Sequence, residues 1–87
     1  MAAMGRKILI IDDEPDYRDI LRHTLKGAGY EVRSANNGEE GLEVLARERP
    51  DMILLDLNLP DTNGYEMCEK IRAQPASWRA CWIRTAS

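Results

Sequence analysis

The sequence predicts an α/β domain in which a parallel sheet is covered by helices on both faces. Two continuous aliphatic runs, at 8–11 and 52–55, each end in an aspartate. An unbroken apolar run bounded by turn residues is typical of a strand buried on both faces, as in parallel sheets. Segments with helical spacing separate the strand-like segments. This alternation implies right-handed crossovers and therefore parallel strands.

Length, charge and cysteine use limit the possible functions. The 87 residues allow one domain, and the net charge of -3 without a basic block argues against binding nucleic acid or an anionic membrane. Cys68 and Cys81 fit no metal-ligand spacing. Because a disulfide framework is also unlikely with two cysteines, a reduced, cytoplasmic setting is expected. The apolar run before Asp12 is too short for a signal peptide or a membrane span. Residues 1–5 are expected to be a disordered start.

The first half of the chain predicts a strand, a helix and a second strand. After the 8–11 run, Pro15 suits the first position of a helix. The helix has one apolar face, formed by Tyr17, Ile20, Leu21, Thr24, Leu25 and Ala28. Gly27 and Gly29 are expected to end it. Residues 30–35 alternate in polarity, which predicts a half-exposed edge strand.

The second half repeats the pattern. Asn37 is expected to cap a second helix, with Glu40 reaching back. Its expected buried side is formed by Leu42, Leu45 and Ala46, and Pro50 closes it before the 52–56 strand. A third helix follows Gly64, with Tyr65, Cys68 and Ile71 expected on its inner face. One more strand is expected near 81–85.

Acidic residues follow both aliphatic strands. If the two strands are parallel neighbours, Asp12, Asp13 and Asp56 meet at one edge of the sheet, where open α/β sheets bind ligands. Two like charges about 4 Å apart repel by about 4 kcal/mol at the dielectric typical near a protein surface, so three carboxylates there need a proton or a cation. Carboxylate oxygens with room for water suit Mg²⁺. Asp56 is then a candidate nucleophile for phosphoryl transfer. The alternative is that these acids only end strands and favour a helix N-terminus.

These segments resemble a known family. The segments Lys7–Pro15 and Leu54–Gly64 are similar in order and spacing to the receiver domain of two-component response regulators. The resemblance is strongest over residues 6–72. It implies a flavodoxin-like strand order, a signalling role rather than metabolic catalysis, and a histidine kinase or phosphotransfer protein as the phosphoryl donor.

The resemblance also implies a role for each site residue. Asp56 matches the phospho-accepting aspartate, Asp13 the direct magnesium ligand, and Asp12 its acidic neighbour. Asn58 matches the position whose backbone carbonyl also binds Mg²⁺ and whose side chain tunes dephosphorylation. Thr85 matches the hydroxyl residue that hydrogen-bonds the phosphoryl group, and Ser87 the second rate-tuning position.

The chain departs from the family pattern after residue 72. The family has five β/α units, and this chain reads as a single truncated receiver domain over 1–87, with about three and a half units. The family's fifth-strand lysine, the fifth strand itself and the last helices have no counterpart here. The fourth strand would then be an open edge, which invites pairing with another chain. A homodimer or an assembly with exchanged elements is therefore expected.

Two other functions remain open. A phosphatase-type hydrolase also uses a strand-end aspartate, but such enzymes usually carry a second aspartate two residues later, where this chain has Asn58. An assembly fragment that is never phosphorylated is the other alternative, because the family's lysine is missing. His23 is read as a solvated helical residue, and Trp78 and Trp82 as packing residues rather than a platform for bases.

Overall fold

The computed structural model describes residues 6–56, 59–73 and 81–84. Four parallel strands form one sheet in the order β2-β1-β3-β4. Their bounds are β1 Lys7–Ile11, β2 Glu31–Ala35, β3 Met52–Asp56 and β4 Cys81–Arg84. This confirms the predicted parallel α/β fold with the flavodoxin-like order that the resemblance implies. The expected strands at 30–35 and 81–85 are present, with β2 and β4 at the two edges of the described sheet.

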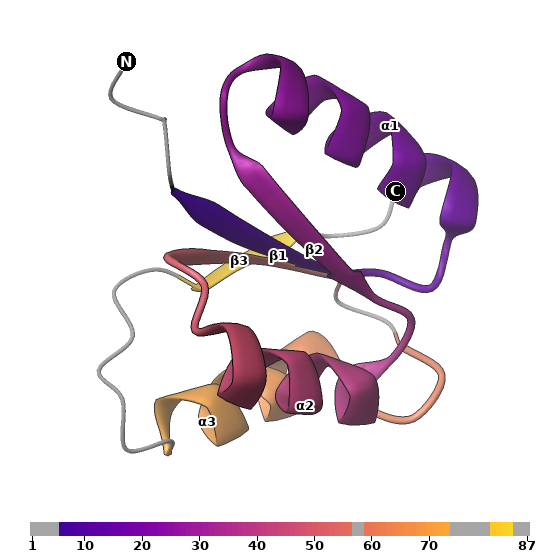
Figure 1. Cartoon of the computed structure of the whole chain (residues 1–87). Coiled ribbons are helices and arrows are strands. Elements are labelled where there is room, and N and C mark those ends of the chain that lie inside the picture. The colour runs from indigo at the N-terminus through magenta and orange to yellow at the C-terminus, as the bar shows by residue number, and fades with distance from the viewer. Residues whose placement is uncertain (1–5, 57–58, 74–80, 85–87) are drawn as a thin grey trace.

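In the described ranges, three helices cover the sheet. They are α1 Pro15–Gly27, α2 Gly38–Glu48 and α3 Gly64–Arg72. Figure 1 shows α1 on one face of the sheet and α2 with α3 on the other. In the described part of the chain, no helix has both the length and the apolar character that crossing a bilayer requires.

The two faces of the sheet carry separate hydrophobic cores. Side chains alternate along a strand, so successive residues of β1 and β3 point to opposite faces. The core under α2 and α3 is the larger, and its buried members are Leu9, Ile11, Ala35, Val44, Leu45, Ile53, Leu55, Met67, Cys68 and Ile71. Among the residues whose burial the structure describes, the core under α1 has Ile8, Ile10 and Val32 as its buried members. Since residues 12 and 56 continue the alternation of 8, 10, 52 and 54, both fall on the α1 side of the sheet.

The predicted helix ends are confirmed. Pro15 opens α1. At the start of α2, the Asn37 side chain accepts a hydrogen bond from the Glu40 backbone N–H at 2.8 Å. Glu40 reaches back, as predicted, and its carboxylate accepts from the Asn36 N–H at 2.6 Å. Gly29 follows α1 in the left-handed region, with φ of 99°, where a residue without a Cβ is favoured.

Five helix-face predictions were wrong. Thr24 and Ala28, expected on the apolar face of the first helix, are exposed. Ile20 is 62% exposed and Tyr65 is 68% exposed, although both were placed on inner faces. Ala46 is also exposed, and Val44 is buried in its place. Spacing identifies an apolar stripe about 100° wide or more, but the rotation of the helix decides which part of the stripe meets the sheet. In α1 the contact is made by Leu21 and Leu25, which pack against the smaller core.

Candidate functional site

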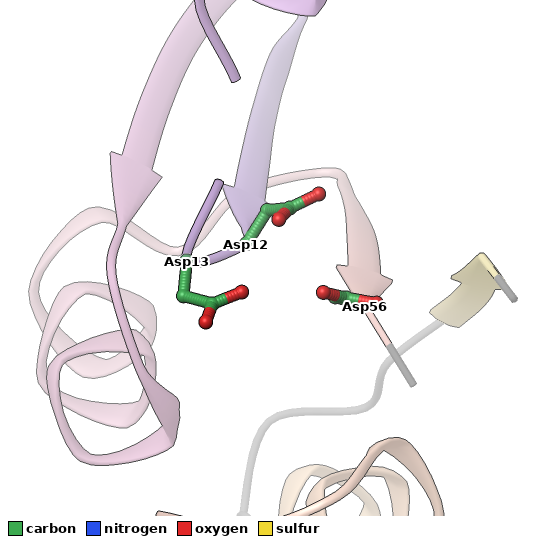
Figure 2. A group of neighbouring side chains, drawn as sticks. All are labelled: Asp12, Asp13 and Asp56. Atoms are coloured by element: carbon green, nitrogen blue, oxygen red, sulfur yellow. The ribbon is translucent and has the colours of Figure 1, made fainter. Parts of the chain in front are cut away.

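Three carboxylates converge at the carboxyl edge of the sheet. Asp12 and Asp13 directly follow β1, and Asp56 is the last residue of β3. One carboxylate oxygen from each lies within 4.8 Å of the others. Figure 2 shows the Asp13 and Asp56 carboxylates pointing toward each other, with the Asp12 carboxylate beside them. The structure thus brings together the acidic residues that the sequence placed at one edge.

The three acids differ in exposure. Asp12 and Asp56 are only 2% and 4% exposed, whereas Asp13 is exposed to solvent. Burying a carboxylate is costly unless charged or hydrogen-bonding groups stabilise it. The cluster therefore has a dry side formed by Asp12 and Asp56, and a side open to water at Asp13.

Backbone contacts fix Asp12 in place. Its N–H donates to the Ala35 carbonyl at 3.1 Å, which continues the pairing of β1 with β2. Its side-chain Oδ1 accepts from the Glu14 N–H at 2.9 Å. Arg18, one turn into α1, donates from Nη1 to the Asp12 carbonyl at 2.7 Å. The β1–α1 connection is thus held at several points before any ligand binds.

Two residues near this edge were not singled out from the sequence. Arg18 holds the Asp12 carbonyl, and Asp61 accepts two backbone hydrogen bonds from the start of α2. The i+6 separation of Arg18 from Asp12 is compatible with the contact but does not predict it. Asp61 meets a segment 23 residues away in the chain, so no local pattern indicates its partner. Asn58 and Thr85, the other predicted site residues, lie outside the described residues, as does Ser87.

Comparison with known proteins establishes the family. Residues 8–87 match the model of the response regulator receiver domain. The chain belongs to this family, whose members are signalling modules rather than metabolic enzymes. It is 42% identical over 71 residues to the alkaline phosphatase synthesis transcriptional regulatory protein PhoP of Bacillus subtilis (strain 168), a match that covers 82% of this chain and 30% of that protein.

Solved structures agree. The response regulator TrrA from Thermotoga maritima, in complex with Mg²⁺-BeF, is 34% identical, with a TM-score of 0.85; the match covers 94% of this chain and 70% of that one. The chemotaxis response regulator CheY4 of Vibrio cholerae is 39% identical, with a TM-score of 0.77 and coverage of 79% and 57%. The chain thus spans 30% of the curated relative and between 57% and 70% of these solved chains.

Proposed function

We propose that this chain receives a phosphoryl group on Asp56 and acts as the switch of a two-component pathway. The observation that carries the proposal is the convergence of three carboxylates within 4.8 Å at the carboxyl edge, in a chain of the receiver family. Receiver domains take their phosphoryl group from histidine kinases or phosphotransfer proteins. An Asp56 Oδ attacks the phosphorus of a phosphohistidine; the P–O bond forms, the P–N bond breaks, and the histidine nitrogen leaves with the electron pair.

The donor set fits Mg²⁺. Asp12, Asp13 and Asp56 offer hard oxygen ligands, and the exposed side at Asp13 leaves room for the water that Mg²⁺ retains. These carboxylates, with the backbone carbonyl of Asn58, are the groups proposed to hold the ion. When bound, Mg²⁺ would offset the negative charge of the carboxylates and of the incoming phosphoryl group. Thr85 is proposed to donate a hydrogen bond to that group, and the Asn58 and Ser87 side chains to tune its hydrolysis.

Intact-mass spectrometry tests the proposal. The protein is incubated with Mg²⁺ and a small acyl phosphate, beside an Asp56→Asn control. A phosphoryl adduct that forms only in the parent is expected. Rapid multiple turnover of the donor would favour the hydrolase, and no adduct in either protein would favour the assembly fragment.

Two further expectations from the sequence are carried as proposals. The β4 edge is proposed to pair with a second copy of the chain, because an edge strand presents unpaired backbone groups; a clean monomer by light scattering at tens of micromolar would contradict this. The protein is proposed to work in the cytoplasm, where its phosphoryl donors would be met. Fractionation of cells that produce the chain checks this placement.

A further inference from the structure

The β3–α3 connection is attached to the start of α2 through one side chain. Asp61 Oδ1 accepts from the Gly38 N–H at 2.8 Å, and Oδ2 accepts from the Glu39 N–H at 3.0 Å. Both N–H groups belong to the first turn of α2, where backbone donors have no partner within the helix. The Gly38 N–H and then the Glu39 N–H hold the pKa of the Asp61 carboxyl below its ordinary value. The carboxylate thus bridges two elements that are distant in sequence.

Close packing accompanies these hydrogen bonds. A Cβ at Gly38 would overlap Thr62 Cγ2 and would lie 3.0 Å from Met67 Sδ and 3.2 Å from Asp61 Oδ1. The first turn of α2 therefore approaches the connection more closely than a residue with a side chain allows. The contact therefore combines close packing at the buried Gly38 with hydrogen bonds to the solvent-exposed Asp61 side chain.

The other contacts found for residues 59–63 are hydrogen bonds within the connection or to α3, and apolar packing against the larger core. The Leu59 N–H donates to the Thr62 carbonyl at 3.1 Å, and Leu59 packs against the larger core. Asn63 caps α3 by accepting from the Glu66 N–H at 2.9 Å. Among the hydrogen bonds found in the described residues, those of Asp61 alone join the connection to α2.

We propose that Asp61 is a positioning residue that sets the Mg²⁺ affinity of the acidic cluster without touching the ion. The inference rests on the proposed function. Asp56 ends β3, and Asp61 follows it a few positions later in the chain. Hydrogen bonds that hold Asp61 against α2 therefore restrict the backbone that leaves Asp56, and with it the placement of the Asp56 carboxylate for the ion. If Asp61 releases α2, the connection occupies more conformations, and the apparent affinity falls with the fraction that is competent to bind.

Calorimetric Mg²⁺ titration of the parent, Asp61→Ala, Asp61→Asn and Asn37→Ala tests this. Asp61→Ala is expected to weaken Mg²⁺ binding about tenfold, the lower end of the effect of groups that orient metal ligands. Asp61→Asn keeps one acceptor oxygen and is expected to lose less. Asn37→Ala removes a cap of the same helix but no hydrogen bond found between α2 and the described residues 59–63, so it is expected to lower the melting temperature and leave the affinity unchanged. Hydrogen exchange at the Leu59 and Glu39 amides is expected to speed up in Asp61→Ala.

Two results would overturn the inference while the proposed function stands: parent-like Mg²⁺ affinity in Asp61→Ala, or an equal loss in Asn37→Ala, which would assign the effect to general destabilisation. If Asp61→Ala does not fold by circular dichroism, the near-isosteric Asp61→Asn decides, and parent-like affinity there overturns the inference. A parent that binds no Mg²⁺ overturns both proposals, and this is seen before any variant is compared.

Discussion

The two ends of the same sheet handle charge in opposite ways. At the carboxyl edge, Asp12, Asp13 and Asp56 place like charges within 4.8 Å. At the amino edge, opposite charges meet: Lys7 Nζ lies 3.0 Å from Glu48 Oε1, and Arg33 Nε lies 3.1 Å from the same oxygen.

At the amino edge, ion pairs connect two strands and a helix. Lys7 begins β1, Arg33 lies in β2, and Glu48 ends α2. Lys7 Nζ also donates to the Glu48 carbonyl at 3.1 Å, and the Lys7 N–H donates to Asp51 Oδ2 at 2.8 Å. The pKa of Glu48 is held below its ordinary value, chiefly by the Lys7 hydrogen bond. At the amino edge, charges of opposite sign attract and hold the elements together. At the carboxyl edge, negative charge is concentrated where a cation and a phosphoryl group are proposed to bind.

The largest expected difference between the edges is the response to Mg²⁺. An ion that binds only the folded chain stabilises it by about 2.7 kcal/mol when its concentration is 100 times the dissociation constant. Thermal unfolding with Mg²⁺ and with a chelator measures this. An unchanged melting temperature at saturating Mg²⁺ would argue against a metal site at the carboxyl edge.

Neutralising an acid at the carboxyl edge is expected to stabilise the metal-free chain. Asp13→Asn removes repulsion from two neighbouring carboxylates, and because Asp13 is exposed the gain is about 1 kcal/mol. Urea unfolding without Mg²⁺ measures it. The same variant is expected to lose most of the Mg²⁺ response, and a variant less stable than the parent would contradict the account of this edge.

The same change at the amino edge is expected to have the opposite sign. Glu48→Gln removes the carboxylate charge that Lys7 and Arg33 share, so the melting temperature should fall, by less than the Mg²⁺ effect raises it. Glu43→Gln, on the exposed side of α2, is the matched control and should change little. Equal melting temperatures for the two variants would mean that the Glu48 ion pairs add no stability.

The smallest expected effect is on the acid side of the pH profile. The folded-state pKa values of Glu48 and Asp61 are lowered from 4.5 and 3.8. Their contribution to stability is therefore complete above those values and is lost as the pH falls through the folded-state pKa. Urea unfolding between about pH 6 and about pH 3 should show the decline, and Glu48→Gln should make it shallower. A profile that is identical in the parent and the variant would contradict the role of Glu48.

The sequence predicts best what is determined locally. The strand at 52–56, Pro15 at the start of α1 and the Asn37 cap depend on a few adjacent residues, and the structure shows all of them. The meeting of Asp12 and Asp56 follows once β1 and β3 are parallel neighbours, an order that the family resemblance implied and the structure shows. The rotation of each helix does not follow from the strand order: Ala46 and Tyr65 were placed inside, but close packing against the sheet turns Val44 and Met67 inward.

Polar contacts between residues far apart in the chain could not be predicted from local sequence patterns. Glu48 meets Lys7 from 41 residues away, and Asp61 meets Gly38 from 23 residues away. Lys7, Glu48 and Asp61 are ordinary surface residue types, and Gly38 contributes only a backbone N–H, so only the three-dimensional arrangement selects each pair. The acids at the strand ends could be predicted because each follows a continuous aliphatic run that indicates a buried strand. No such sequence pattern indicates the role of Asp61.

The glycines of α2 have a consequence for the order in which the chain folds. Gly41 lets the helix approach β1 so closely that a Cβ there would lie 2.6 Å from Ile11 Cδ1. Within a helix, glycine is less favourable than alanine by about 1 kcal/mol, so α2 is a weak helix by itself. We therefore expect α2 to form only after β1 has formed and can pack against it. During refolding, the backbone amides of α2 should gain protection from hydrogen exchange later than those of the other helices.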